Sequence, residues 1–178
     1  MKPLVSILIP AYNAEAWISD TLRSAIAQTW ERKEIIVVDD GSKDQTLAVG
    51  LQFESEQVKV VTQKNQGASA TRNNAFATSK GDYVQWLDAD DLMGPEKTAS
   101  QMEAAERCGS KRTLSSGAWA HFMHRPYRAE FRPSPLRQDL LPAEWLTSKA
   151  RTSNPAANEV VLGAGLLILV RPVFGETP

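Results

Sequence analysis

Short, mostly apolar runs recur at regular intervals along the first half of the chain. They have the length and composition of strands that are buried on both faces. The four runs are residues 4–9, 34–39, 58–62 and 83–87. A stretch with helical features follows each run. This alternation predicts βαβ units with right-handed crossovers, and therefore an α/β fold built on a mostly parallel sheet flanked by helices.

The stretches between the apolar runs carry helical periodicity or helix start signals. Helices are expected over residues 15–28, from residue 43, over residues 69–79 and over residues 95–107. In the first, Trp17 and Leu22 recur at helical spacing and are predicted to face the core. Asn13 is predicted to cap this helix, and Ser42 with Gln45 forms a capping box for the second.

The second half of the chain is less regular because several prolines interrupt it. Residues 113–122 are predicted to form a strand and residues 140–149 a short helix. The apolar run over residues 160–170 is predicted to be a buried strand or a pair of strands. It is shorter than the roughly 20 residues that cross a bilayer, so no membrane span is predicted.

Composition excludes several classes of protein. The length of 178 residues favours one domain, and the net charge of −1 offers no basic excess for a nucleic-acid partner. Cys108 is the only cysteine, which excludes an intramolecular disulfide and a cysteine-based metal cluster and favours a reduced thiol. No signal peptide is recognised at the start of the sequence. We therefore expect a cytoplasmic protein, with peripheral association at the cytoplasmic face of a membrane left open.

Three carboxylates lie within four residues at the end of the fourth apolar run. They are Asp88, Asp90 and Asp91. Anions about 4 Å apart near a protein surface repel one another by roughly 4 kcal/mol per pair. A bound cation relieves this repulsion, and ligation by oxygen alone suits Mg²⁺ or Mn²⁺, which often bridge to the phosphates of a substrate. The alternative is a solvated acidic turn that caps the next helix.

Loops with unusual residues follow all four predicted strands. The carboxyl ends of parallel strands lie at one edge of a sheet, where ligands collect. The loops are Pro10-Ala11-Tyr12-Asn13, Asp39-Asp40-Gly41-Ser42, residues 65–73, and Asp88-Ala89-Asp90-Asp91. We therefore expect the four loops to converge on a single site.

This arrangement resembles the family 2 glycosyltransferases of the GT-A fold. The resemblance rests on residues 5–13, 36–44, 67–73 and 81–91, the last of which holds the equivalent of the family's DXD motif. It implies inverting, metal-assisted transfer of a sugar from a nucleotide diphosphate, with UDP the common case, to a carbohydrate, lipid-linked or protein acceptor. It also implies that residues 1–110 are the donor-binding half, and residues 111–178 a partial acceptor-side half of the same domain.

The resemblance assigns one group of residues to the nucleotide. Pro10, Ala11 and Tyr12 would form the wall around the base, with Asn13 beside them. Asp40 would accept a hydrogen bond from the base, uracil being the common one. Asp39 either shares the nucleotide-sugar site with Asp40 or only forms the turn.

A second group is assigned to the diphosphate and the metal. Arg72 would lie near the diphosphate, the alternative being a surface ion pair. Asp88 would contact the ribose or the metal, and Asp90 would be the main ligand of Mn²⁺ or Mg²⁺. Ala89 lies between them in the nucleotide-sugar site, and Asp91 would brace the loop.

The sequence does not supply an evident catalytic base. In the family, the base follows a strand that here resembles residues 165–175, so it is expected beyond Pro178. Asp139 and Glu144 are the remaining carboxylates, and neither matches the pattern. We interpret the chain as a truncated glycosyltransferase.

Three other classes of protein are alternatives to a glycosyltransferase. One is a non-catalytic nucleotide-sugar-binding module, which the missing base favours. A sugar-nucleotide pyrophosphorylase fits less well because the first loop has no glycine. A dinucleotide-dependent oxidoreductase fails because no G-x-G-x-x-G follows a strand.

Overall fold

The computed structural model describes residues 2–108, 114–116, 120–122, 144, 160–162 and 166–169. Strands and helices alternate over the first hundred residues. They are β1 (Val5–Ala11), α1 (Ile18–Ile26), β2 (Lys33–Asp39), α2 (Thr46–Leu51), β3 (Val58–Thr62), α3 (Ala68–Thr78), β4 (Tyr83–Trp86) and α4 (Lys97–Cys108). The described strands after α4 are β5 (Leu114–Ser116), β6 (Ala120–Phe122), β7 (Val160–Leu162) and β8 (Leu166–Leu169).

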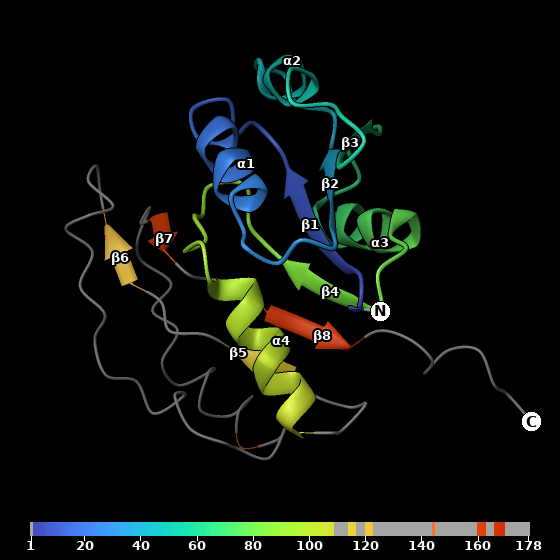
Figure 1. Cartoon of the computed structure of the whole chain (residues 1–178). Coiled ribbons are helices and arrows are strands. Elements are labelled where there is room, and N and C mark those ends of the chain that lie inside the picture. Colours follow the sequence, from blue (N-terminus) through green and yellow to red (C-terminus); the bar gives the residue numbers. More distant parts are fainter. Residues whose placement is uncertain are drawn as a thin grey trace, which may run out of the picture.

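Among the described residues, six strands form one sheet in the order β3-β2-β1-β4-β8-β5 (Figure 1). Strand β1 is parallel to β2 and β4, and β2 is parallel to β3, whereas β8 runs antiparallel to both β4 and β5. Ala11 lies opposite Asp39 where β1 and β2 end. The ladder continues one residue further, because the Asp40 N–H donates to the Ala11 carbonyl at 2.8 Å. The predicted α/β fold with a mostly parallel sheet is confirmed.

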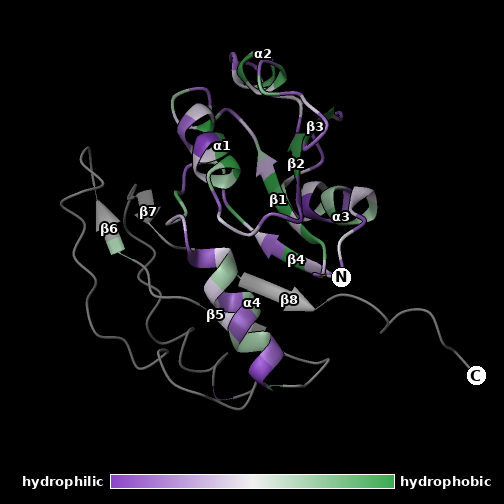
Figure 2. Ribbon diagram, viewed as in Figure 1, coloured by the Kyte–Doolittle hydropathy of each residue, from purple (hydrophilic) through white to green (hydrophobic). Residues whose placement is uncertain are grey.

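Alternate residues of the central strand face two separate layers of the core. Ile7 belongs to a cluster with Leu22 of α1 and Met102 of α4. Leu8 belongs to another cluster with Ala75 of α3. Helices α1 and α4 therefore cover one face of the sheet and α3 covers the other (Figure 1). Figure 2 shows hydrophobic residues concentrated in β1 and β2, as expected of strands covered on both faces.

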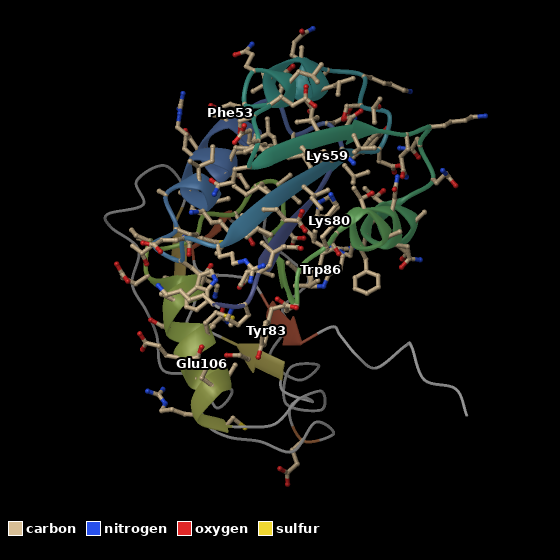
Figure 3. The ribbon with its side chains drawn as sticks, turned by 45° about the vertical axis from the view of Figure 1, so that its right-hand side comes forward. Phe53, Lys59, Lys80, Tyr83, Trp86 and Glu106 are labelled. Atoms are coloured by element: carbon tan, nitrogen blue, oxygen red, sulfur yellow. The ribbon has the colours of Figure 1, made fainter. Side chains whose placement is uncertain are left out.

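Helix α4 also covers the start of β4. Tyr83 lies beside Glu106 of α4 (Figure 3). Burial raises the pKa of the Tyr83 hydroxyl, and the negative charges of Glu106 and Asp82 raise it further. The phenol therefore stays neutral in the physiological range and packs as part of the interface between α4 and the sheet.

Two helix starts differ from those that the sequence predicts. Helix α1 begins at Ile18, and Asn13 lies well before it with a left-handed φ of 50°, so Asn13 does not cap it. Helix α2 begins at Thr46, and its N-cap residue Gln45 makes no side-chain capping bond. The predicted capping box of Ser42 and Gln45 is therefore wrong.

The predicted strand over residues 113–122 is two short strands in different sheets. Strand β5 joins the main sheet, whereas β6 pairs with β7 in a second, two-stranded sheet. The apolar run over residues 160–170 supplies β7 and β8, which do not pair with each other. Of the predicted helix over residues 140–149, the structure describes only Glu144, which is helical, and Asp139 lies outside the described residues. Within the described part of the chain, no helix is long and apolar enough to cross a membrane.

Gly81 lies where the chain enters β4 in close contact with β1. Its N–H donates to Ser6 Oγ at 2.8 Å. A Cβ at this position would collide with Ser6 Oγ and would lie 2.7 Å from both the Ser6 nitrogen and the Tyr83 oxygen. Because backbone atoms of buried strands cannot move aside, we expect Gly81→Ala to lower the free energy of unfolding by about 1–3 kcal/mol in urea titrations.

Gly94→Ala is the matched control for this prediction. A Cβ at Gly94 would meet no atom within 4 Å. The control should change the free energy of unfolding by no more than about 0.5 kcal/mol. Equal losses in the two variants would show that the close approach at Gly81 does not matter.

Candidate functional site

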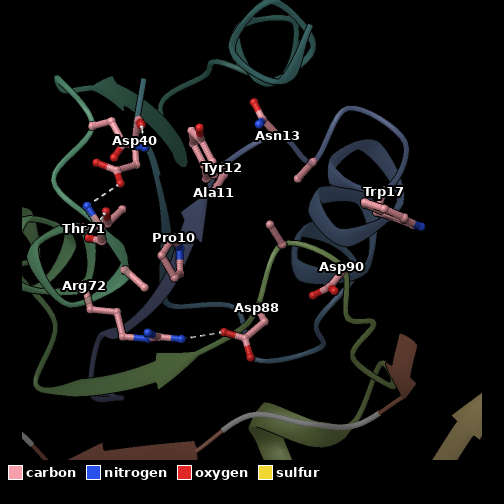
Figure 4. A pocket seen from close by; sticks show the side chains of 15 residues that line it. Pro10, Ala11, Tyr12, Asn13, Trp17, Asp40, Thr71, Arg72, Asp88 and Asp90 are labelled. Atoms are coloured by element: carbon pink, nitrogen blue, oxygen red, sulfur yellow. Dashed lines mark hydrogen bonds and ion pairs between the residues drawn. The ribbon is translucent and has the colours of Figure 1, made fainter. Parts of the chain in front are cut away.

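A pocket of about 420 Å³ opens at the carboxyl edge of the sheet (Figure 4). This volume is in the range of small-molecule sites. Its lining residues are Pro10, Ala11, Tyr12, Asn13, Ala14, Trp17, Asp40, Asn65, Gly67, Ala68, Thr71, Arg72, Asp88, Ala89 and Asp90. Every residue that the sequence assigns to the site is among them except Asp39. The four loops therefore meet in space as expected, while the roles assigned to their residues stay predictions.

Asp40 lies at one end of the pocket and is held by hydrogen bonds. Its Oδ1 accepts from Gln63 Nε2 at 2.8 Å and from the Gln66 N–H at 2.9 Å, and its Oδ2 accepts from the Gly67 N–H at 2.8 Å. Burial acts to raise the pKa of Asp40, but these donors together with Thr71 outweigh it and lower the pKa below its ordinary value. Asp40 is therefore ionised and fixes the loop that precedes α3. A carboxylate offers about four acceptor positions, and Gln63, Gln66, Gly67 and Thr71 together match that number.

Asp39 is placed differently from its neighbour. It is buried and does not line the pocket. Its carboxylate accepts a hydrogen bond from Thr62 Oγ1 at 3.0 Å and a longer one, at 3.4 Å, from the Ser42 N–H. Of the two roles left open by the sequence, the structure shows the turn-forming one. The assignment of Asp39 to the nucleotide-sugar site stays a prediction.

The loop after β1 is hydrogen-bonded to the loop after β2. The Asn13 N–H donates to Ser42 Oγ, and the Lys43 N–H donates to Asn13 Oδ1, each at 2.9 Å. The Ala14 N–H donates to Thr46 Oγ1 at 2.7 Å. Asparagine tolerates the left-handed backbone that this arrangement requires. The second loop therefore fixes the pocket wall that the first loop forms.

The three acids of the loop after β4 have different surroundings. Asp88 Oδ1 accepts from Arg72 Nη2 at 3.1 Å (Figure 4). Asp91 is buried outside the pocket and interacts electrostatically with Lys97. Asp90 lines the pocket, and no basic side chain in the described part of the chain forms an ion pair with it. Burial raises the pKa of Asp90, and the charge of Asp88 raises it further. A cation would relieve more repulsion at Asp90 than at either neighbour.

Asp88 and Asp90 are the two carboxylates that the acidic loop offers to a divalent cation. The described residues contain no group of three or more Asp, Glu, His or Cys side chains that could hold a metal. Mg²⁺ in phosphate-binding sites commonly uses one or two carboxylates and completes its coordination with phosphate and water oxygens. The pair therefore fits a Mn²⁺ or Mg²⁺ ion that binds together with a diphosphate, rather than one bound by protein ligands alone.

Helix α1 is hydrogen-bonded to this acidic loop. Thr21 Oγ1 donates to the Ala89 carbonyl at 2.8 Å, and the Met93 N–H donates to Ser24 Oγ at 3.1 Å. Thr21 is fully buried, so water does not compete for its bond. The start of α1 is thus held in a fixed position relative to Asp88 and Asp90.

Trp17 is a pocket residue that the sequence interpretation places elsewhere. The helical spacing predicts that it faces the core, but it is the N-cap residue of α1, 46% exposed, and lines the pocket. The prediction is wrong because α1 begins at Ile18, three residues after the predicted start, so Trp17 precedes the helix and its buried residues. Asn65, in the loop before α3, and Thr71, in α3 itself, also line the pocket, and both belong to residues 65–73, which the sequence singled out without giving either a role.

Residues 6–144, well over half of the chain, match the model of the glycosyl transferase family 2. The chain belongs to this family. An uncharacterized glycosyltransferase from Rickettsia bellii is 36% identical over 119 residues, which are 66% of this chain and 17% of that protein. TuaG from Bacillus subtilis, named as a teichuronic acid biosynthesis glycosyltransferase, is 41% identical over 105 residues, which are 57% of this chain and 42% of TuaG. The chain therefore spans less than half the length of these curated relatives.

Solved structures of glycosyltransferases share the fold of this family member. The crystal structure of Staphylococcus aureus TarS 1–349 matches with a TM-score of 0.57 and 29% identity, over 62% of this chain and 34% of that one. The same region of TarS has been solved with UDP and with UDP-GlcNAc. The mannosyltransferase PcManGT from Pyrobaculum calidifontis, in complex with GDP-Man and Mn²⁺, matches with a TM-score of 0.54 over 72% of this chain and 37% of that one. At 21% identity, that match shows the fold alone.

Lys97 gives the stability of this region a measurable pH dependence. Burial lowers its pKa from 10.5 to about 8, although the Asp91 carboxylate acts in the opposite direction. Between these two values the unfolded chain keeps the proton that the folded chain has lost. The unfolded state then binds more protons, so the free energy of unfolding should rise with pH, by about 1–3 kcal/mol in total.

Denaturant titrations between pH 7.5 and about 10.5 test this, with Lys97→Met removing the titrating group. The variant should lack most of the rise. Lys59→Met, which removes an exposed lysine of β3, should keep it. Parallel pH profiles for the parent and the Lys97 variant would refute the assignment.

Proposed function

We propose that this chain holds the donor site of an inverting glycosyltransferase that uses a UDP-sugar. The proposal rests on the difference in chemistry between the two ends of the pocket. Asp40 lies at one end, and the Arg72–Asp88 pair and Asp90 lie away from it along the lining (Figure 4). Such a pocket suits a ligand with a hydrogen-bonding base at one end and an anionic group at the other. Membership of the family and the UDP complexes of TarS support this choice of donor.

The base would lie against the loop after β1. Tyr12 lines the pocket with 47% of its surface exposed, so its ring is accessible to a planar ligand. Pro10 and Ala11 complete this wall, which is held in place through Asn13. Asp40 would accept an N–H from uracil in place of Thr71, whose hydroxyl also donates to the Gly67 carbonyl at 2.8 Å.

The diphosphate would lie at the acidic loop. Arg72 is a half-exposed partner of Asp88, and ion pairs of this kind contribute little to stability. Arg72 can therefore turn to donate to phosphate oxygens at small cost. Asp90 and Asp88 would hold Mn²⁺ or Mg²⁺, which when bound neutralises charge on the departing diphosphate.

The proposed reaction is a single displacement. The acceptor oxygen attacks the anomeric carbon, the bond from that carbon to the diphosphate oxygen breaks, and a carboxylate base takes the acceptor proton. We place the donor-binding half in residues 1–110 and an acceptor-side half in residues 111–178. The acceptor would be a carbohydrate, a lipid-linked group or a protein, and binding at the cytoplasmic face of a membrane would suit the second.

Calorimetric titration of UDP into the chain, with Mn²⁺ and again with EDTA, tests the donor site. Binding is expected with Mn²⁺ and should be lost with EDTA. Asp90→Asn should weaken binding in Mn²⁺ by about tenfold or more, because it removes a charged ligand. In EDTA neither the variant nor the parent should bind UDP.

Asp20→Asn is the control for this experiment. Asp20 is an exposed acid of α1 whose partner is Arg23, and it does not line the pocket. Its removal should leave the titration unchanged. UDP binding by the Asp90 variant as tight as that of the parent in Mn²⁺ would show that the metal assignment is wrong.

Recognition of the base is tested by Asp40→Asn with UDP and GDP as competing ligands. The substitution should cost about 1–3 kcal/mol of UDP binding, because it disturbs the acceptor that the base would use. The preference for UDP over GDP should fall as well. An equal loss for both nucleotides would indicate that Asp40 only holds the loop.

A further inference from the structure

We propose that Trp17 forms the surface on which the sugar ring of the donor lies, an inference that rests on the proposed function. Its side chain is 46% exposed and lines the pocket together with Ala89 and Asp90. Figure 4 shows Trp17 on the far side of the pocket from Asp40, with Asp90 closer to it than Arg72 is. A ligand whose base lies at Asp40 would therefore extend its other end toward Trp17.

The backbone of Trp17 is fixed. Its N–H donates to the Ala14 carbonyl at 3.0 Å, and its own carbonyl accepts from the N–H groups of Asp20 at 2.9 Å and Thr21 at 3.1 Å. Thr21 in turn bonds to the carbonyl of Ala89 in the acidic loop. The backbone that carries the indole is thus fixed relative to the proposed phosphate site, which limits the ordering that binding would require.

The chemistry of the indole suits a sugar rather than a phosphate. A pyranose ring has a face of C–H groups and a rim of hydroxyls, whereas a diphosphate has only charged oxygens. A tryptophan offers a large, flat apolar area, which gains stability when a C–H face removes it from water. Asp90, which also lines the pocket, would offer its carboxylate to the hydroxyls on the rim of the ring.

Exposure alone does not distinguish Trp17, since single exposed aromatic residues are common on proteins. Phe76 of α3 is 37% exposed as well, but it does not line the pocket. The combination of exposure, a fixed backbone and a place in the pocket lining is what assigns Trp17 to a ligand. Phe76 therefore serves as the matched control.

The test compares UDP with UDP-GlcNAc as probes, each titrated in Mn²⁺ into the parent chain and into Trp17→Ala, Trp17→Phe and Phe76→Ala. Trp17→Ala should weaken UDP-GlcNAc by about tenfold, or about 1.4 kcal/mol, and leave UDP within about twofold. Trp17→Phe keeps a flat ring and should recover part of the loss. Phe76→Ala should change neither affinity.

Tryptophan fluorescence provides a second readout. UDP-GlcNAc should alter the emission of the parent more than UDP does, and this difference should vanish in Trp17→Phe. An equal effect of Trp17→Ala on both ligands, or none on either, would overturn the role of Trp17 while leaving the proposed function intact. A parent chain that binds neither ligand would overturn the proposed function and this inference with it.

Discussion

Negative charge crowded at the carboxyl edge of the sheet is the constraint on which the structure of this region depends. Parallel strands bring their following loops to one edge, and here these loops carry several carboxylates. Three of them are compensated locally, and Asp90 is the exception with a raised pKa, because repulsion between close anions is strong where water is partly excluded. Backbone N–H groups compensate Asp40, Arg72 pairs with Asp88, and Lys97 lies close to Asp91. The different partners determine what each acid can do.

The kind of partner separates a rigid end of the pocket from an adaptable one. The donors to Asp40 include backbone groups of Gln66 and Gly67, which cannot leave without unfolding their loop. The partner of Asp88 is the flexible, half-exposed side chain of Arg72, whose ion pair is easily exchanged. A ligand would therefore find one end preformed and would rearrange side chains at the other. This division suits a nucleotide-sugar donor whose nucleobase is unchanged by the reaction while the bond between its diphosphate and its sugar breaks.

The sequence was sufficient for the four strands of the first half and for the convergence of the loops that follow them, because both follow from simple rules. Strands covered on both faces have sequences that are unbroken apolar runs. Parallel strands bring the loops that follow them to the same edge of the sheet. The sequence could not separate Asp39 from Asp40, which are both buried, since neighbouring side chains point in opposite directions and only the end of β2 decides which one lines the pocket. The cap predictions failed because Asn13 and Ser42 find partners across two loops rather than within one helix. Trp17 was predicted to face the core because the helix was expected to start at residue 15, whereas α1 starts at Ile18.

The partners of these carboxylates also decide whether one of them can act as the catalytic base. A general base needs a carboxylate that is free to take a proton at the moment of attack. In the described pocket, Asp40 is occupied by hydrogen bonds that keep its pKa low, and Asp88 is paired with Arg72. Asp90 has the raised pKa that a base would use, but a cation bound there would lower it again and occupy its oxygens. Metal binding and proton abstraction are therefore competing uses of Asp90, and a donor site of this kind requires a base from another segment of the protein.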